Sequence, residues 1–177
     1  SVRDISFEQC AHPEDFEGPE WAGKQFWIEN LEGLQYATSA RMIDIAYTSA
    51  AEGKRIKDLS PIAGLTQLET LILKQNGIDN ISPLNGLCNL TTLDISANQL
   101  IEDISAVSGM TSLQSLNASF NKVNSVEGLK ELENLEYISV SNNNITTLPD
   151  LSKLAKVYFL DISHNKLTDV SEIAKMK

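Results

Sequence analysis

Apolar residues return along this chain with a period of about 22 residues. In each repeat a short frame of alternating apolar positions precedes an asparagine, as in Leu71-Ile72-Leu73 and Leu93-Asp94-Ile95. Those asparagines are spaced 22, 23, 22 and 22 residues apart: Asn76, Asn98, Asn121, Asn143 and Asn165. Alternation is the period of a β-strand, whose successive side chains point to opposite faces. The pattern therefore predicts one short strand in each repeat, near residues 42–46, 70–74, 92–96, 115–119, 137–141 and 159–163.

The apolar spacing changes to three residues after each asparagine, as in Ile78, Ile81 and Leu84. This spacing favours a short 3₁₀ or extended return path, and Pro61 and Pro83 within it disfavour an α-helix. Repeats of this kind stack, so their strands form one parallel sheet. We therefore predict an α/β right-handed solenoid in which these central strand residues are buried: Leu71, Leu93, Leu116, Ile138 and Leu160.

The asparagine series has a structural interpretation. Each asparagine follows a strand, where the chain turns inward and backbone groups lose their partners. A buried amide can donate to and accept from such groups in the neighbouring coil. We predict a hydrogen-bonded ladder, and not a row of ligand-binding side chains.

The two ends of the chain differ from its middle. Residues 1–27 are rich in aromatics, such as Phe16 and Trp21, and are interpreted as an N-terminal cap or linker that covers the first coil. The repeat array is assigned to residues 28–177, with an insertion at 49–54 placed in a loop. No polar cap is visible at the C-terminal end, so the array is expected to be truncated there and to belong to a longer chain.

Composition narrows the function classes. The 177 residues carry a net charge of −10, which argues against nucleic acid and against an anionic membrane surface as partners. No window approaches the roughly 18 uninterrupted apolar residues of a membrane span. Cys10 and Cys88 are interpreted as free thiols, and Cys10 with His12 offers too few ligands for a metal.

The repeat Leu-x-x-Leu-x-x-Leu-x-Leu-x-x-Asn-x-Ile, present from Leu65 to Ile78, resembles the leucine-rich repeat family. The 22-residue period and the stretch from Ile81 to Leu87 resemble the internalin-like repeats of bacterial surface proteins. Repeats such as 123–135 look equally like those of eukaryotic phosphatase-regulatory proteins. The resemblance covers residues 28–177 and implies a horseshoe with a concave parallel sheet and a short 3₁₀ or extended convex side.

No catalytic set is expected. Asp161 and His164 lie close in sequence, and Ser141 of the preceding coil could complete a triad. Polar residues occupy these positions in most coils, so chance proximity explains the group better, and we predict no catalytic, cofactor-binding or metal site.

Three functions are compatible with the sequence. The first is a protein-binding module of a bacterial cell-surface or secreted protein, from a Gram-positive bacterium, acting as a monomer within a longer chain. The second is a structural spacer in a larger surface protein, suggested by a bland column of serines at exposed strand positions: Ser96, Ser119, Ser141 and Ser163. The third is a cytoplasmic regulator that docks on an enzyme, which free cysteines favour.

A partner protein is expected on the concave face, where strand side chains alternate with the buried ones. These form two columns: Met42, Thr70, Thr92, Ser115, Tyr137 and Phe159, then Asp44, Ile72, Asp94, Asn117, Ser139 and Asp161. Exposed aromatic side chains are common anchors of protein interfaces. The predicted partner-binding residues are Tyr137, Phe159, Phe120, His164, Asp161 and Ile72.

Overall fold

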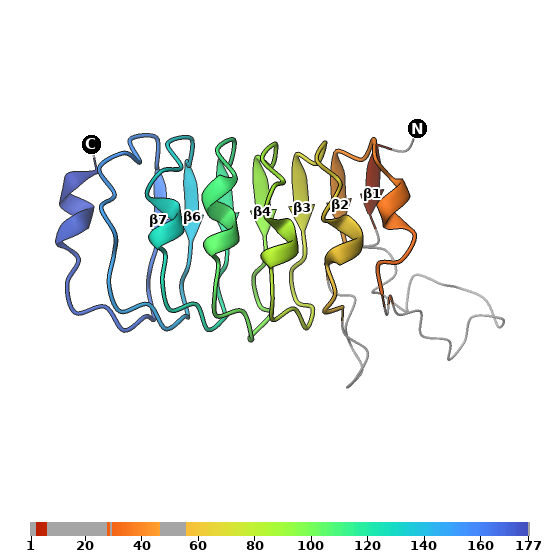
Figure 1. Ribbon diagram of the computed structural model, residues 1–177. Coiled ribbons are helices and arrows are strands. Elements are labelled where there is room, and N and C mark those ends of the chain that lie inside the picture. The colour runs from red at the N-terminus through yellow and green to blue at the C-terminus, as the bar shows by residue number, and fades with distance from the viewer. Residues whose placement is uncertain (1–2, 7–27, 29, 47–55, 177) are drawn as a thin grey trace, which may run out of the picture.

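The chain forms a row of coils that stack side by side into one curved array (Figure 1). A computed structural model describes residues 3–6, 28, 30–46 and 56–176. Seven strands form one parallel sheet in sequence order: β1 (Asp4–Ser6), β2 (Met42–Asp44), β3 (Thr70–Ile72), β4 (Thr92–Asp94), β5 (Ser115–Asn117), β6 (Tyr137–Ser139) and β7 (Phe159–Asp161). Six of these strands lie where the apolar period predicts them.

The first strand, β1, was not predicted. It pairs with β2 in parallel register, with Ile5 opposite Ile43. Its three residues contain one apolar side chain, so no alternation marks it in the sequence. Because residues 7–27 and 47–55 lie outside the described residues, the N-terminal cap and the 49–54 insertion remain predictions.

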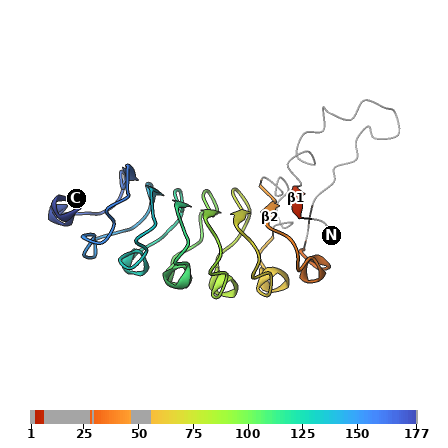
Figure 2. The same cartoon turned by 90° about the horizontal axis from the view of Figure 1, so that it is seen from above.

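The outer side of the array consists of short 3₁₀ turns. They are η3 (Leu34–Tyr36), η4 (Ser60–Ile62), η5 (Ser82–Leu84), η6 (Ser105–Gly109), η7 (Glu127–Leu129) and η8 (Ser171–Lys175). Figure 2 shows the strands on the concave side of the arc and the 3₁₀ turns on its convex side. This is the predicted horseshoe with a concave sheet, and the helical turns of the described residues are all of the 3₁₀ type.

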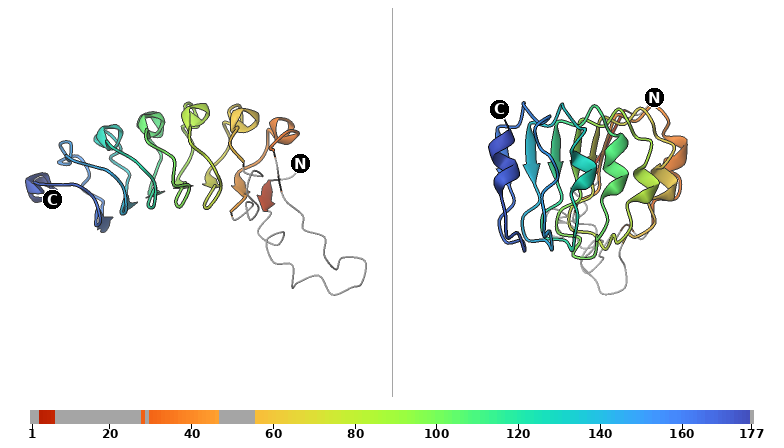
Figure 3. Two further views of the ribbon diagram at one scale, coloured as in Figure 1. Left: turned by 90° about the horizontal axis from the view of Figure 1, so that it is seen from below. Right: turned by 60° about the vertical axis from the view of Figure 1, so that its left-hand side comes forward.

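One recurring cap begins most of these turns. The side-chain oxygen of Asn80 accepts a hydrogen bond from the N–H of Ser82, and Asp103 accepts one from Ser105 in the same way. Between η7 and η8 the position that corresponds to the donors Ser82 and Ser105 is occupied by Pro149, which has no N–H to donate. The described residues 145–151 accordingly contain no 3₁₀ turn, and Figure 3 shows the gap in the convex row.

The core is one continuous file of aliphatic side chains between the two sides. Leu71, Leu93, Leu116 and Ile138 are buried as predicted. Leu160 is only half-buried, contrary to the prediction. The reason is that β7 is the last strand of the sheet, so no described coil packs against its outer side.

The asparagine ladder is confirmed. Asn98 shows the full pattern: its Nδ2 donates to the carbonyl oxygens of Ile95, in its own coil, and Leu73, in the preceding one, at 2.9 and 3.1 Å. Its Oδ1 accepts from the N–H groups of Asn76 and Ile78 at 3.1 and 3.2 Å. One buried amide thus joins adjacent coils and closes the turn after the strand.

The 23-residue coil interrupts the ladder. Gln99 there has a left-handed backbone, with φ 65°, and Leu100 is 36% exposed, while Ile101 occupies the core position that Ile78 fills one coil earlier. Asn121 is buried, yet its Oδ1 has no hydrogen-bond partner among the described residues. In the regular coils, the Oδ1 of the ladder asparagine accepts a hydrogen bond from a backbone N–H of the preceding coil. The extra residue has displaced that N–H.

Candidate protein-binding surface

The first concave column changes character along the array. Its positions in β3, β4 and β5 carry the small polar side chains of Thr70, Thr92 and Ser115. In β6 and β7 the same positions carry Tyr137 and Phe159, whose rings stack with centroids 4.5 Å apart and planes 3° from parallel. The predicted adjacency of these two aromatics is therefore present, and Phe159 is 42% exposed.

The second concave column caps the strands. Asp94 Oδ1 accepts from the N–H of Ser96 at 2.8 Å, and Asp161 Oδ1 accepts from the N–H of Ser163 at 3.0 Å. The Ser163 hydroxyl also donates to Asp161, and these bonds hold the pKa of the Asp161 carboxyl below its usual value. Asp161 therefore has a structural role at the end of β7, whatever it contacts besides.

The six predicted partner-binding residues do not form one cluster. Tyr137, Phe159 and Asp161 share one end of the sheet, whereas Ile72 lies in β3, three strands from Tyr137. Phe120 and His164 lie beyond the strand ends, at matching positions two coils apart. Both have left-handed backbones, with φ 56° and 53°, and both side chains are exposed.

Four exposed large apolar residues were not predicted from the sequence, namely Tyr36, Leu100, Tyr158 and Val170. Tyr158 is 75% exposed and directly precedes Phe159 at the C-terminal end of the array. Its position in the repeat corresponds to Glu136 and Gln114, both of which reach solvent, so alignment of the coils could have identified it. Leu100 could not be found this way, because it is the residue by which its coil exceeds the period.

The serine column is less exposed than predicted. Ser96, Ser119 and Ser141 are buried, and Ser163 of the last coil is exposed. These serines follow the strands and turn inward beside the ladder, where the next coil covers them. Because three of the four are buried, these serines do not describe the chemical character of the exposed concave surface.

The Ser141–Asp161–His164 group is not arranged for nucleophilic catalysis. Ser141 is buried, and its hydroxyl is among the donors that lower the pKa of Asp161, after those of Ser163. His164 acts on Asp161 only electrostatically. A serine nucleophile needs its hydroxyl directed at the histidine, and that contact is absent from the described residues.

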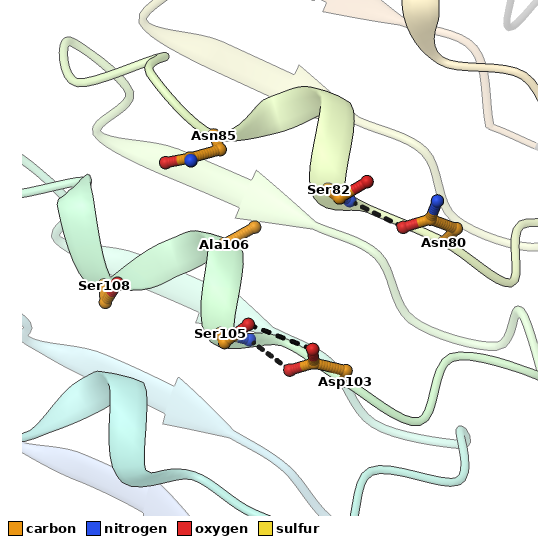
Figure 4. A pocket seen from close by; sticks show the side chains of 7 residues that line it. All are labelled: Asn80, Ser82, Asn85, Asp103, Ser105, Ala106 and Ser108. Atoms are coloured by element: carbon orange, nitrogen blue, oxygen red, sulfur yellow. Dashed lines mark hydrogen bonds between the residues drawn. The ribbon is translucent and has the colours of Figure 1, made fainter.

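A polar hollow of about 320 Å³ lies on the convex side between η5 and η6 (Figure 4). Its side chains largely satisfy one another, since both oxygens of Asp103 accept from Ser105, one from the N–H and one from the hydroxyl. No group of three or more His, Cys, Asp or Glu side chains converges anywhere in the described part of the chain. The hollow is a consequence of the turn caps.

Two further features of the described residues concern the cysteines and the helices. Cys88 is an exposed free thiol, whereas Cys10 lies outside the described residues. Within the described ranges, no helix has the length and apolar character needed to cross a bilayer.

Comparison with known proteins agrees with this geometry. The family model described as "Leucine Rich repeats (2 copies)" matches residues 66–109, 111–153 and 133–175. No curated protein sequence matches the chain.

Solved structures resemble the fold closely. Internalin InlF from Listeria monocytogenes has a TM-score of 0.74 and 28% identity, over 80% of this chain and 40% of its own. Internalin C2 from the same organism has a TM-score of 0.68 and 28% identity, over 85% and 74%. The plant peptide hormone receptor RGFR1, solved in complex with RGF2, has a TM-score of 0.68 and 25% identity, over 80% and 23%. The chain thus spans about two fifths of InlF and less than a quarter of the plant receptor.

Proposed function

Since the chain belongs to the leucine-rich repeat family, whose members are generally protein-interaction modules, we propose that it is a non-enzymatic protein-binding module of a bacterial cell-surface or secreted protein. The internalins support the bacterial assignment, and the receptor complexed with RGF2 supports protein or peptide recognition by such a fold. A host protein or another partner protein is the proposed ligand, held on the concave face.

The stacked pair of Tyr137 and Phe159 is the observation that carries this proposal. Four polar residues of the second concave column are engaged in strand caps: Asp44, Asp94, Asn117 and Asp161. The two aromatic rings stack on each other and make no strand cap, and the exposed Tyr158 directly precedes Phe159 in the sequence. Aromatic side chains bury large areas at little cost in conformational entropy and dominate the energetics of many interfaces.

The competing explanation is that Phe159 only covers the outer edge of the sheet. The double substitution Y137A/F159A distinguishes partner binding from covering of the sheet edge. The two measurements are the capture of cell-surface proteins by the immobilised chain and the melting temperature of the variant. We expect capture of a protein identified with the wild type to be lost, with the melting temperature almost unchanged.

The matched control is T70A/T92A, which truncates the same positions of β3 and β4. It should retain capture. A large fall in melting temperature with capture intact would assign the rings to the fold and move the partner site elsewhere.

The alternatives remain a spacer between ligand-binding domains of a larger surface protein and a cytoplasmic regulatory scaffold, which the exposed thiol of Cys88 favours. The full-length open reading frame discriminates between them, because a secretion signal is incompatible with the cytoplasmic role. Light scattering of the purified chain tests the proposed monomer.

A further inference from the structure

A second surface follows the edge of the array where the strands end, on both sides of the buried asparagines. We call it the strand-end rim and define it by six residues: Leu100, Phe120, Lys122, Asn144, His164 and Lys166. From Asn98 to Asn165, the residues directly before and after each ladder asparagine include no Asp or Glu. The rest of the chain is acidic, since the whole sequence has a net charge of −10.

Backbone hydrogen bonds hold the rim residues in register. The N–H of Asn144 donates to Val123 O, beside Lys122, and the N–H of Lys166 donates to Ile145 O, beside Asn144, each at 2.8 Å. Lys122 and Lys166 are thus two coils apart, or about 10 Å, since each coil advances by about one strand spacing.

The two rim lysines are unpaired within the described part of the chain. Among the described residues, neither Lys122 nor Lys166 takes part in an ion pair or side-chain hydrogen bond, and both are exposed. On the convex side, by contrast, Lys130 pairs with Glu127 and Lys153 with Glu131. His164 interacts electrostatically with Asp161, so the two lysines supply the positive charge of the rim.

The rim also exposes apolar surface. Phe120 is 56% exposed, and Leu100 was pushed outward by the extra residue of its coil. The N–H of Gln99 donates to Phe120 O at 3.2 Å, which places Leu100 and Phe120 on neighbouring coils at the same edge. Apolar and cationic side chains therefore occupy the same edge of the array.

We propose that the strand-end rim binds an acidic segment of a partner protein, with an apolar side chain on Leu100 and Phe120 and carboxylates on Lys122 and Lys166. Charge complementarity selects this occupant. An extended polyanion or anionic membrane would also meet the acidic remainder of the chain and be repelled, whereas a short segment confined to the rim is not. The rim is separate from the concave aromatic pair.

The probe is a fluorescein-labelled hexapeptide with a central Leu-Phe flanked on each side by Glu-Asp, titrated by fluorescence anisotropy. We expect saturable, salt-sensitive binding that K122E/K166E weakens by about tenfold or more. Substitution K122Q/K166Q, which only removes the charges, should weaken binding less, and F120S should weaken it at any salt concentration.

The control K57E/K156E makes the same change in net charge away from the rim, and Y137A/F159A alters only the concave site. Both should bind the peptide like the wild type. Unchanged binding to K122E/K166E, or equal loss with K57E/K156E, would overturn the proposal. Rim-dependent binding of phosphatidylserine vesicles without peptide binding would overturn the choice of occupant.

Discussion

At the scale of single residues, one buried amide per coil joins each repeat to the preceding one. Asn98 and Asn121 donate in the same way to their own coil and to the preceding coil. They differ in the acceptor, because two N–H groups reach Asn98 Oδ1 and none reaches Asn121 Oδ1. Comparing Asn98 with Asn121 therefore measures how much the hydrogen bonds accepted by Oδ1 contribute to stability.

Substitution N98A should lower the free energy of unfolding more than N121A. It removes the oxygen that accepts from the N–H groups of Asn76 and Ile78, and the loss of such an acceptor costs about 1–3 kcal/mol per buried donor, so the difference should be about 1 kcal/mol or more. Urea denaturation measures it. Equal losses would mean that the donated hydrogen bonds alone stabilise the ladder.

Acid should destabilise the fold through its capping aspartates. The pKa of Asp161 is lowered in the folded state, chiefly by the Ser163 hydroxyl. Such a group contributes stability at pH values above its unfolded pKa of about 3.9, and this is lost as pH falls through the lower folded value. The melting temperature should therefore decline below about pH 4, and D161N should reduce part of that decline.

The neutral-pH stability of D161N should be modestly below that of the wild type, because the amide can still cap the strand but lacks the ionised carboxylate. Asn117 already caps β5 with its amide oxygen, which accepts from Ser119. An unchanged acid profile would show that other carboxylates, such as Asp58 and Asp169, govern the acid response.

At the scale of the element, each strand contributes one central side chain to the core. Leu116 is fully buried, so L116A should lower the free energy of unfolding by about 2–5 kcal/mol. L160A should lower the free energy of unfolding by less, because Leu160 is half-buried and its side chain makes fewer packing contacts. Denaturant unfolding of both variants checks this order.

The 23-residue coil offers a prediction about the turn after the strand. Deleting Leu100 moves Ile101 to two residues after Asn98, the spacing of Asn76 and Ile78. A backbone N–H can then reach Asn121 Oδ1, so the deletion should stabilise the fold by about 1–3 kcal/mol. A lower melting temperature would mean that the left-handed turn at Gln99 is the better packed arrangement.

At the scale of the whole molecule, the local stability of a coil depends on its position in the array. A solenoid coil contacts only its neighbours, so end coils are held on one side and central coils on two. Amide hydrogen exchange should therefore be slowest in β4 and β5 and fastest in β7. Uniform protection across the sheet would indicate that the whole array opens as one unit.

The sequence by itself determined the period, the six strands, the core frame and the asparagine ladder. The physical reason is that each coil contacts only its neighbouring coils, about one period away in the sequence, so the repeat pattern and the tertiary pattern coincide. Tyr137 and Phe159 could be placed side by side for the same reason, because residues one period apart are neighbours in the sheet.

Only the tertiary structure decided what depends on the neighbouring coil. Pairing with β2 makes a strand of Asp4–Ser6, and cover by the next coil buries Ser96, Ser119 and Ser141 while the missing cover leaves Leu160 half-exposed. Left-handed turns direct Phe120 and His164 to the strand-end rim, away from the aromatic pair. These outcomes depend on turn geometry and on cover by a neighbour, and the identity of a residue within its own repeat specifies neither.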